Sequence, residues 1–94
     1  MHKYELVCII HPDLDELAFN GALDKVKGWI VEAGGSVDKT DVWGRKRLAY
    51  IIRKQREGQY FLLNLSLPPA ATAGLDQNLR FLEPVIRHMI TLVD

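Results

Sequence analysis

The sequence predicts a protein of the α+β class whose elements follow the order βαββαβ, with a four-stranded antiparallel sheet and both helices on one face. Two observations support this prediction. Apolar residues recur at every second position in four segments, as in half-buried strands, and at helical spacing in two others. Proline and glycine stand between these segments, where the chain must turn. Because 94 residues suffice for one hydrophobic core, we expect a single domain over residues 1–94.

The first strand and the first helix have the clearest patterns. Residues 4–10 alternate as in a strand, and Pro12 ends it because proline has no N–H to give to a sheet. A helix follows from Leu14 and ends at Gly34-Gly35, because glycine accepts the left-handed conformation that closes a helix. The apolar stripe of this helix consists of Phe19, Ala22, Leu23, Val26, Ile30 and Ala33.

The second half of the sequence predicts two strands, a helix and a last strand. These are a long strand over 37–52, a turn over 56–59, a strand over 60–67, a helix over 72–82 and a strand over 85–93. Pro68-Pro69 precedes the helix and Pro84 ends it. Leu48 and Phe61 fall on the more apolar sides of the two middle strands. We therefore expect both in the core between the sheet and the helices.

Basic residues are concentrated in the middle of the chain, although 12 basic and 12 acidic residues give a formal net charge of zero. Residues 45–56 hold six bases and no acid, whereas residues 1–38 hold seven acids and three lysines. A neutral protein with such a basic stripe presents it to a polyanion, and nucleic acid is the leading candidate. The alternative is that these charges protect an exposed sheet edge from aggregation.

The sequence gives no sign of a membrane protein, a disulfide or a metal site. No apolar stretch approaches the roughly 18 residues that cross a bilayer, and no secretory signal pattern precedes the first strand. The lone Cys8 lies on the inward side of its strand, where we interpret it as a small hydrophobe. His2, His11 and His88 do not share a site. We expect an unprocessed cytoplasmic protein that is not an enzyme and binds no metal or cofactor.

Several motifs together resemble the family of bacterial small-subunit ribosomal protein six. They are Trp43-Gly44-Arg45-Lys46-Arg47-Leu48-Ala49-Tyr50, Gly58-Gln59-Tyr60-Phe61-Leu62, Tyr4-Glu5, Pro12-Asp13-Leu14 and Gly34-Gly35. The resemblance covers nearly the whole chain and agrees with a ferredoxin-like fold. It implies a structural constituent of the small ribosomal subunit. It also implies binding to the central domain of small-subunit ribosomal RNA, as a heterodimer with ribosomal protein eighteen.

The basic stripe and two further residues supply the candidate RNA-binding site. The candidate RNA-binding residues are Arg45, Lys46, Arg47, Arg53, Lys54, Arg56, Arg87 and Lys3. Such side chains release counterions from phosphate, and arginine also forms paired hydrogen bonds to phosphate oxygens. Strand alternation places Trp43, Arg45 and Arg47 on one side and Lys46 on the other. By family position, the resemblance assigns RNA contacts to Lys46, Arg47, Lys54 and Arg87.

The sheet face without helices is the candidate surface for a protein partner. Val7 and Ile9 lie on it, which makes this face more apolar than a solvated face usually is. We expect Val7, Ile9 and Trp43 to bind the partner. The alternative for Val7 and Ile9 is that they are scattered exposed apolar residues of the kind that most proteins carry. Trp43 could instead pack on the sheet or stack on a base.

The sequence argues against two other functions and leaves a third open. A phosphohydrolase of the acylphosphatase type would need an anion cradle after the first strand, where Asp13, Asp15 and Glu16 would repel phosphate. Tyr60-Phe61 is faintly similar to the aromatic strand of RNA-recognition motifs, although core packing is favoured for Phe61. A small-metabolite-sensing or self-associating ferredoxin-like module is the main alternative. Such a module would self-associate without RNA.

Overall fold

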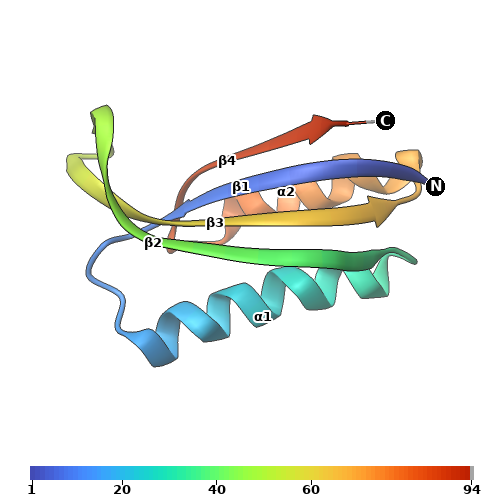
Figure 1. Cartoon of the computed structure of the whole chain (residues 1–94), viewed down its shortest axis with the longest axis horizontal. Helices are drawn as coiled ribbons and strands as arrows, with labels where there is room; N and C mark the ends of the chain where they lie inside the picture. Colours follow the sequence, from blue (N-terminus) through green and yellow to red (C-terminus); the bar gives the residue numbers. More distant parts are fainter. Residues whose placement is uncertain (94) are drawn as a thin grey trace.

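The computed structural model describes residues 1–93, and its elements follow the predicted order (Figure 1). They are β1 (His2–Ile10), α1 (Glu16–Glu32), β2 (Ser36–Ile52), β3 (Gln55–Leu67), a short 3₁₀-helix (Pro69–Ala71), α2 (Thr72–Phe81) and β4 (Val85–Leu92). All predicted strands and helices are confirmed. The largest difference is that β3 begins at Gln55 rather than at residue 60.

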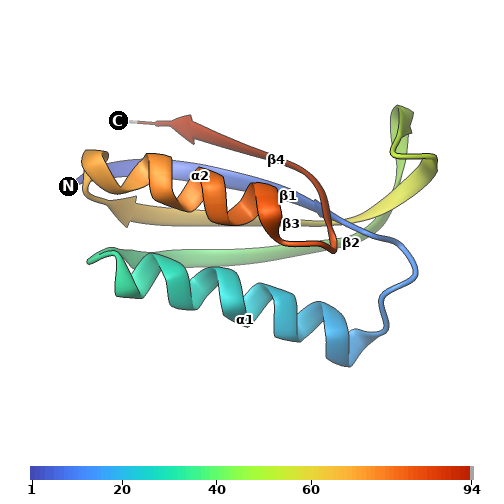
Figure 2. The same ribbon diagram turned by 180° about the vertical axis from the view of Figure 1, so that it is seen from behind.

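The four strands form one antiparallel sheet in the order β2-β3-β1-β4, so β2 and β4 are its edges. Figure 2 shows both helices in front of the same face of the sheet. Within the described chain, the other face carries no helix. The predicted ferredoxin-like α+β sandwich is therefore confirmed.

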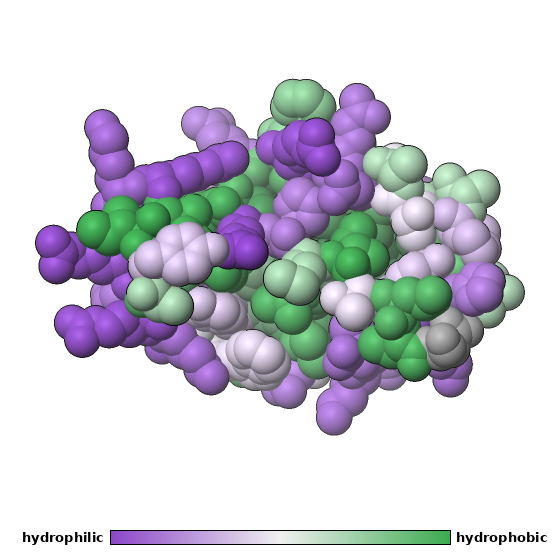
Figure 3. Space-filling model, turned by 90° about the horizontal axis from the view of Figure 1, so that it is seen from above, coloured by the Kyte–Doolittle hydropathy of each residue, from purple (hydrophilic) through white to green (hydrophobic). Residues whose placement is uncertain are grey.

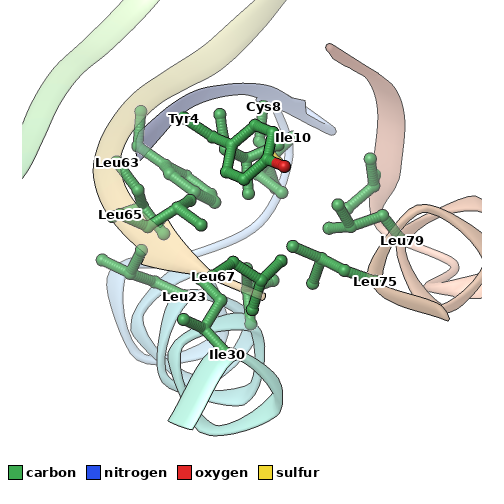
Figure 4. Packing of buried hydrophobic residues seen from close by; sticks show 14 of the residues in the cluster. Tyr4, Cys8, Ile10, Leu23, Ile30, Leu63, Leu65, Leu67, Leu75 and Leu79 are labelled. Atoms are coloured by element: carbon green, nitrogen blue, oxygen red, sulfur yellow. The ribbon is translucent and has the colours of Figure 1, made fainter. Parts of the chain in front are cut away.

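The main core lies between the sheet and the helices, where side chains of β1, β3 and both helices meet (Figure 4). Cys8 and Phe61 are fully buried there, and Phe19 of α1 packs edge-on against Phe61 with ring centroids 6.0 Å apart. Burial raises the pKa of the Cys8 thiol to about 12, so this side chain stays neutral. The core position of Phe61 is confirmed. Its ring cannot stack on a base because neither of its faces reaches the surface.

The turn between β2 and β3 lies at Arg53 and Lys54, so the prediction of a turn at residues 56–59 is wrong. Both residues have positive φ, 47° and 66°, as in the two-residue type I′ turns of hairpins. Non-glycine residues reach this left-handed conformation at a cost of roughly 1–2 kcal/mol each. Gly58, which suggested the turn, is instead a buried residue of β3.

The outer parts of β2 and β3 form a hairpin arm, residues 44–58, that bends away from the rest of the sheet (Figure 1). Two irregularities in the pairing of β2 with β3 accompany the bend. One lies between Val42 and Gly44, where Gly44 has a φ of 81°. At the other, four residues of β2, 48–51, lie opposite Arg56 alone. Extra residues in one strand bend it and increase its twist.

The irregularity at Gly44 also reverses which residues of β2 face the helices. Val42 pairs with the core residue Phe61, but Gly44 pairs with the next residue of β3, Tyr60, on the opposite face. Leu48 therefore lies on the helix-free face, in a second small cluster with Ile9 and Ile86. The prediction of Leu48 in the main core is wrong, because alternation does not continue through a bulge.

Gly58 allows the hairpin arm to approach β1. A Cβ atom at residue 58 would lie 2.3 Å from Cγ2 of Ile9 and 3.6 Å from Cδ2 of Leu48. No side chain fits in that space without moving Ile9. The absence of a side chain at residue 58 thus lets Leu48 and Ile9 pack together.

We expect Gly58→Ala to lower the free energy of unfolding by about 1–3 kcal/mol, because the added methyl group overpacks the contact with Ile9. Gly21→Ala is the matched control. A Cβ atom at Gly21 meets nothing within 4 Å, and alanine is favoured over glycine within α1 by about 1 kcal/mol. Chemical denaturation should give changes of opposite sign, and an unchanged stability for Gly58→Ala would contradict the close approach.

Candidate nucleic-acid interface

A cleft of about 390 Å³ along the hairpin arm gathers half of the predicted RNA-binding residues. Its basic residues are Arg45, Arg47, Lys54 and Arg56, and its acidic residues are Asp13 and Glu57. We call this hollow the basic cleft. Figure 3 shows hydrophilic side chains gathered at the end of the molecule that carries the arm (left).

Arg45 forms one wall of the basic cleft and is held by the chain after β1. Its guanidinium donates a hydrogen bond to the carbonyl of Pro12, and it lies 3.5 Å from the carboxylate of Glu57. The amide of Gln59 also donates to this segment, with the carbonyl of Leu14 2.9 Å away. The segment between β1 and α1 is thereby fixed against the arm, and Arg45 has a structural contact as well as an exposed charge.

The other three basic side chains of the cleft are exposed and have no internal partner within the described residues. Arg47, Lys54 and Arg56 make no side-chain hydrogen bond or ion pair with the rest of residues 1–93. Their donors face solvent, and Lys54 is at the turn itself. These three side chains can therefore bind an anion without first breaking an internal contact.

Lys46 and Trp43 lie together on the helix-free face, away from the basic cleft. The Nζ atom of Lys46 is 4.9 Å from the centroid of the Trp43 ring, which itself stacks on Tyr60 at 6.1 Å. The predicted grouping of Trp43 with Arg45 is wrong, because the bulge before Gly44 changes the alternation. The indole is 41% exposed, so it stays available to a partner.

Arg53, Arg87 and Lys3 also lie outside the basic cleft. Arg53 donates to the carbonyl of Val85 at 3.3 Å, so its side chain reaches from the tip of the arm to the start of β4. Arg87, on the helix-free face, donates to the hydroxyl of Tyr50. Lys3 is near the opposite end of β1, about 20 Å along the strand from Ile9.

The candidate partner surface is an apolar hollow of about 270 Å³ on the helix-free face. Its apolar lining includes Val7, Ile9, Leu48, Tyr60 and Met89. Ile9 is only 8% exposed and lies at the base, whereas Met89 is 52% exposed and Val7 is half-buried. The hollow therefore offers apolar surface beside the arm, within reach of Arg87 at its rim.

A polar cluster at α2 and β4 was not predicted from the sequence. Asp76 accepts hydrogen bonds from Nε2 of His88 at 2.7 Å and from the guanidinium of Arg80 at 2.9 Å. The hydrogen bond from His88 lowers the pKa of Asp76, and Arg80 adds to this effect. The i,i+4 spacing of Asp76 and Arg80 was the available signal for the helical part of this cluster.

The residues that the structure describes contain no group of three potential metal ligands and no helix long and apolar enough to cross a membrane.

The fold and its basic arm define a small ferredoxin-like α+β protein with two separate surfaces, one basic and one apolar. Comparison with known families is more specific. The family model described as ribosomal protein S6 matches residues 3–91, and the chain belongs to this family.

Known relatives agree over nearly the full length. The chain is 44% identical over 90 residues to small ribosomal subunit protein bS6 of Clostridium botulinum strain Hall, covering 96% of each sequence. It is 40% identical to the bS6 protein of Clostridium kluyveri, covering 96% of this chain and 95% of that one. The crystal structure of 30S ribosomal protein S6 from Thermotoga maritima superposes with a TM-score of 0.93 at 27% identity, covering 98% and 87%.

Family membership settles several of the expectations from the sequence. The resemblance to ribosomal protein six is confirmed. The protein is a structural, non-enzymatic component of the small ribosomal subunit, and its location is the cytoplasm. The acylphosphatase-type alternative is therefore wrong.

We expect the lowered pKa of Asp76 to make stability depend on pH in the acid range. A carboxyl whose pKa is lower in the folded state stabilises the fold above its ordinary pKa, here 3.8, and loses this effect as the pH falls through the folded-state pKa. Asp76→Asn should therefore flatten the acid limb of a plot of unfolding free energy against pH. Asp24→Asn on α1 is the control, and equal acid limbs in the wild type and Asp76→Asn would contradict the assignment.

Proposed function

We propose that the protein, acting as a single domain, binds the central domain of small-subunit ribosomal RNA together with ribosomal protein eighteen. The basic cleft is the observation on which this proposal chiefly rests. It holds Arg47, Lys54 and Arg56, which are exposed and make no ion pair within residues 1–93. Phosphate groups satisfy such donors and release counterions when they bind.

The arrangement of the cleft favours RNA binding over protection of a sheet edge. Edge protection needs only one or two charges along the outer strand. Here the bases come from both strands of the arm and surround a hollow, with Arg56 on β3 and Arg47 on β2. Arg53 and Lys54 also place two charges at the tip. A curved basic surface of this kind is complementary to a phosphate backbone, whereas protection of a sheet edge does not require a hollow.

The apolar hollow supports a protein partner on the helix-free face. Val7, Ile9 and Trp43 are the proposed contacts. Ile9 forms the base of the hollow and Val7 is half-buried in its lining. Trp43 does not line the hollow, but it stacks on Tyr60, which does. Buried apolar and aromatic groups supply most of the binding energy at protein interfaces. The two surfaces are separate, so RNA and the partner can bind at the same time.

The heterodimer is tested by measuring affinity for a central-domain RNA fragment with and without ribosomal protein eighteen. We expect much weaker binding without the partner, because a protein of zero net charge has limited electrostatic affinity of its own. The self-associating alternative predicts a different result. It requires a stable homodimer in size-exclusion chromatography without RNA, and no change in affinity when the partner is added.

Removal of a cleft cation should reduce RNA affinity and its salt dependence. For Arg47→Ala or Arg56→Ala, each lost phosphate contact should lower the slope of log affinity against log salt by about 0.7 to 1. The unfolding free energy should stay within about 0.5 kcal/mol, because both side chains are exposed. Lys25→Ala on α1 is the control. Unchanged affinity in both cleft variants, with heat-induced aggregation instead, would favour edge protection.

A charge in the apolar hollow should separate partner binding from RNA binding. We expect Val7→Asp to weaken binding of ribosomal protein eighteen by about tenfold or more, because the carboxylate would lose its hydration at the interface. Val31→Asp places the same change on α1, where Val31 is 61% exposed. Isothermal titration of folded variants measures the effect. Equal partner affinity for the two variants would contradict a contact at Val7.

A further inference from the structure

A second basic hollow lies at the edge of the sheet opposite the basic cleft. It measures about 220 Å³ and is lined by residues of the arm, α2 and β4. Three arginines from these three elements surround it: Arg53, Arg80 and Arg87. The basic cleft contains only residues of the arm and of the segment after β1, so the two hollows share no lining residue.

Internal contacts hold the three arginines of this hollow in place. Arg53 donates to the carbonyl of Val85, Arg87 donates to Tyr50, and Arg80 pairs with Asp76. Each guanidinium has five N–H groups, so these contacts leave donors available. Positioned donors lose less conformational entropy when they bind a ligand.

The charge balance of the hollow favours an anion. Its lining contains no acidic residue, and Asp76 is the carboxylate that contacts it through Arg80 and His88. The Arg80 side chain is 68% exposed, so its free donors reach solvent. Three fixed positive charges against one carboxylate leave a local positive potential.

We propose that Arg80, with Arg53 and Arg87, forms a second phosphate-binding site for ribosomal RNA at the β4 edge. This proposal rests on the proposed function and extends it from one side of the arm to both. The side chain of Arg53 reaches from the tip of the arm to the start of β4, and the neighbouring Lys54 lines the basic cleft, so the tip lies between the two hollows. A continuous RNA backbone can thus contact the arm from both sides, with Asp76 holding Arg80 in position.

Two substitutions that break the same ion pair distinguish this proposal from a purely structural role. Arg80→Gln removes a cation, and Asp76→Asn removes the neighbouring anion. If the pair only stabilises α2, both variants leave the affinity for RNA unchanged. If Arg80 contacts phosphate, the two changes have opposite effects on affinity.

The measurement uses the full chain with ribosomal protein eighteen and a central-domain RNA fragment at several salt concentrations. Arg80→Gln should weaken binding roughly five- to tenfold near 0.1 M salt and lower the salt slope by about 0.7 to 1. Asp76→Asn should strengthen binding by about threefold, because one negative charge is lost within roughly 7 Å of the phosphate. Lys25→Gln on α1 should change neither quantity.

Each other outcome has a definite meaning. Unchanged affinity for Arg80→Gln, while Arg47→Ala weakens binding, would overturn the second site and leave the proposed function intact. Unchanged affinity for both Arg80→Gln and Arg47→Ala would count against the proposed function itself. A response of the Arg80 side-chain NMR signals to inorganic phosphate but not to the RNA would assign the hollow to a free anion and overturn the proposal.

Discussion

The contact between Gly58 and Ile9 determines where the hairpin arm lies relative to the sheet. Because residue 58 has no side chain, β3 can approach β1 closely enough for Leu48 to cover Ile9. The arm continues past this contact and bends, and its tip reaches Val85 through Arg53. Both basic hollows therefore depend on a packing contact that contains no charge. A cationic surface can be built in this way without burying any of its charges.

The order of elements was predictable because hydrophobic periodicity and chain-breaking residues agree along most of the chain. Phe61 was placed correctly because β3 alternates without interruption from Tyr60 onward. Leu48 was misplaced because the irregularity before Gly44 shifts the alternation by one residue. A glycine inside a strand pattern is a known sign of a bulge, so this error could have been avoided. The turn could not have been found, because Arg53-Lys54 resembles no preferred turn sequence.

The sequence predicted which residues form a basic surface, but it did not predict how they are arranged. A run of bases in one segment predicts a basic surface, and four of these residues do surround one cleft. Their distribution over the two sides of the arm depends on the bend of the arm. Strand alternation alone does not predict this bend. Arg80 was missed for a related reason. It belongs to α2, far from the run in sequence, and lines the same hollow as Arg53 because the Arg53 side chain reaches from the arm to the start of β4.

The backbone at the tip of the arm agrees with the proposed role of its charges. Arg53 and Lys54 both occupy the left-handed region, where asparagine or glycine would lower the conformational energy. Together they cost roughly 2–4 kcal/mol relative to an unstrained pair. Local strain of this kind concentrates at functional sites, where the side chain does something that the favoured residue cannot. Here the favoured residues would leave the tip without charge, at the point where the two basic hollows meet.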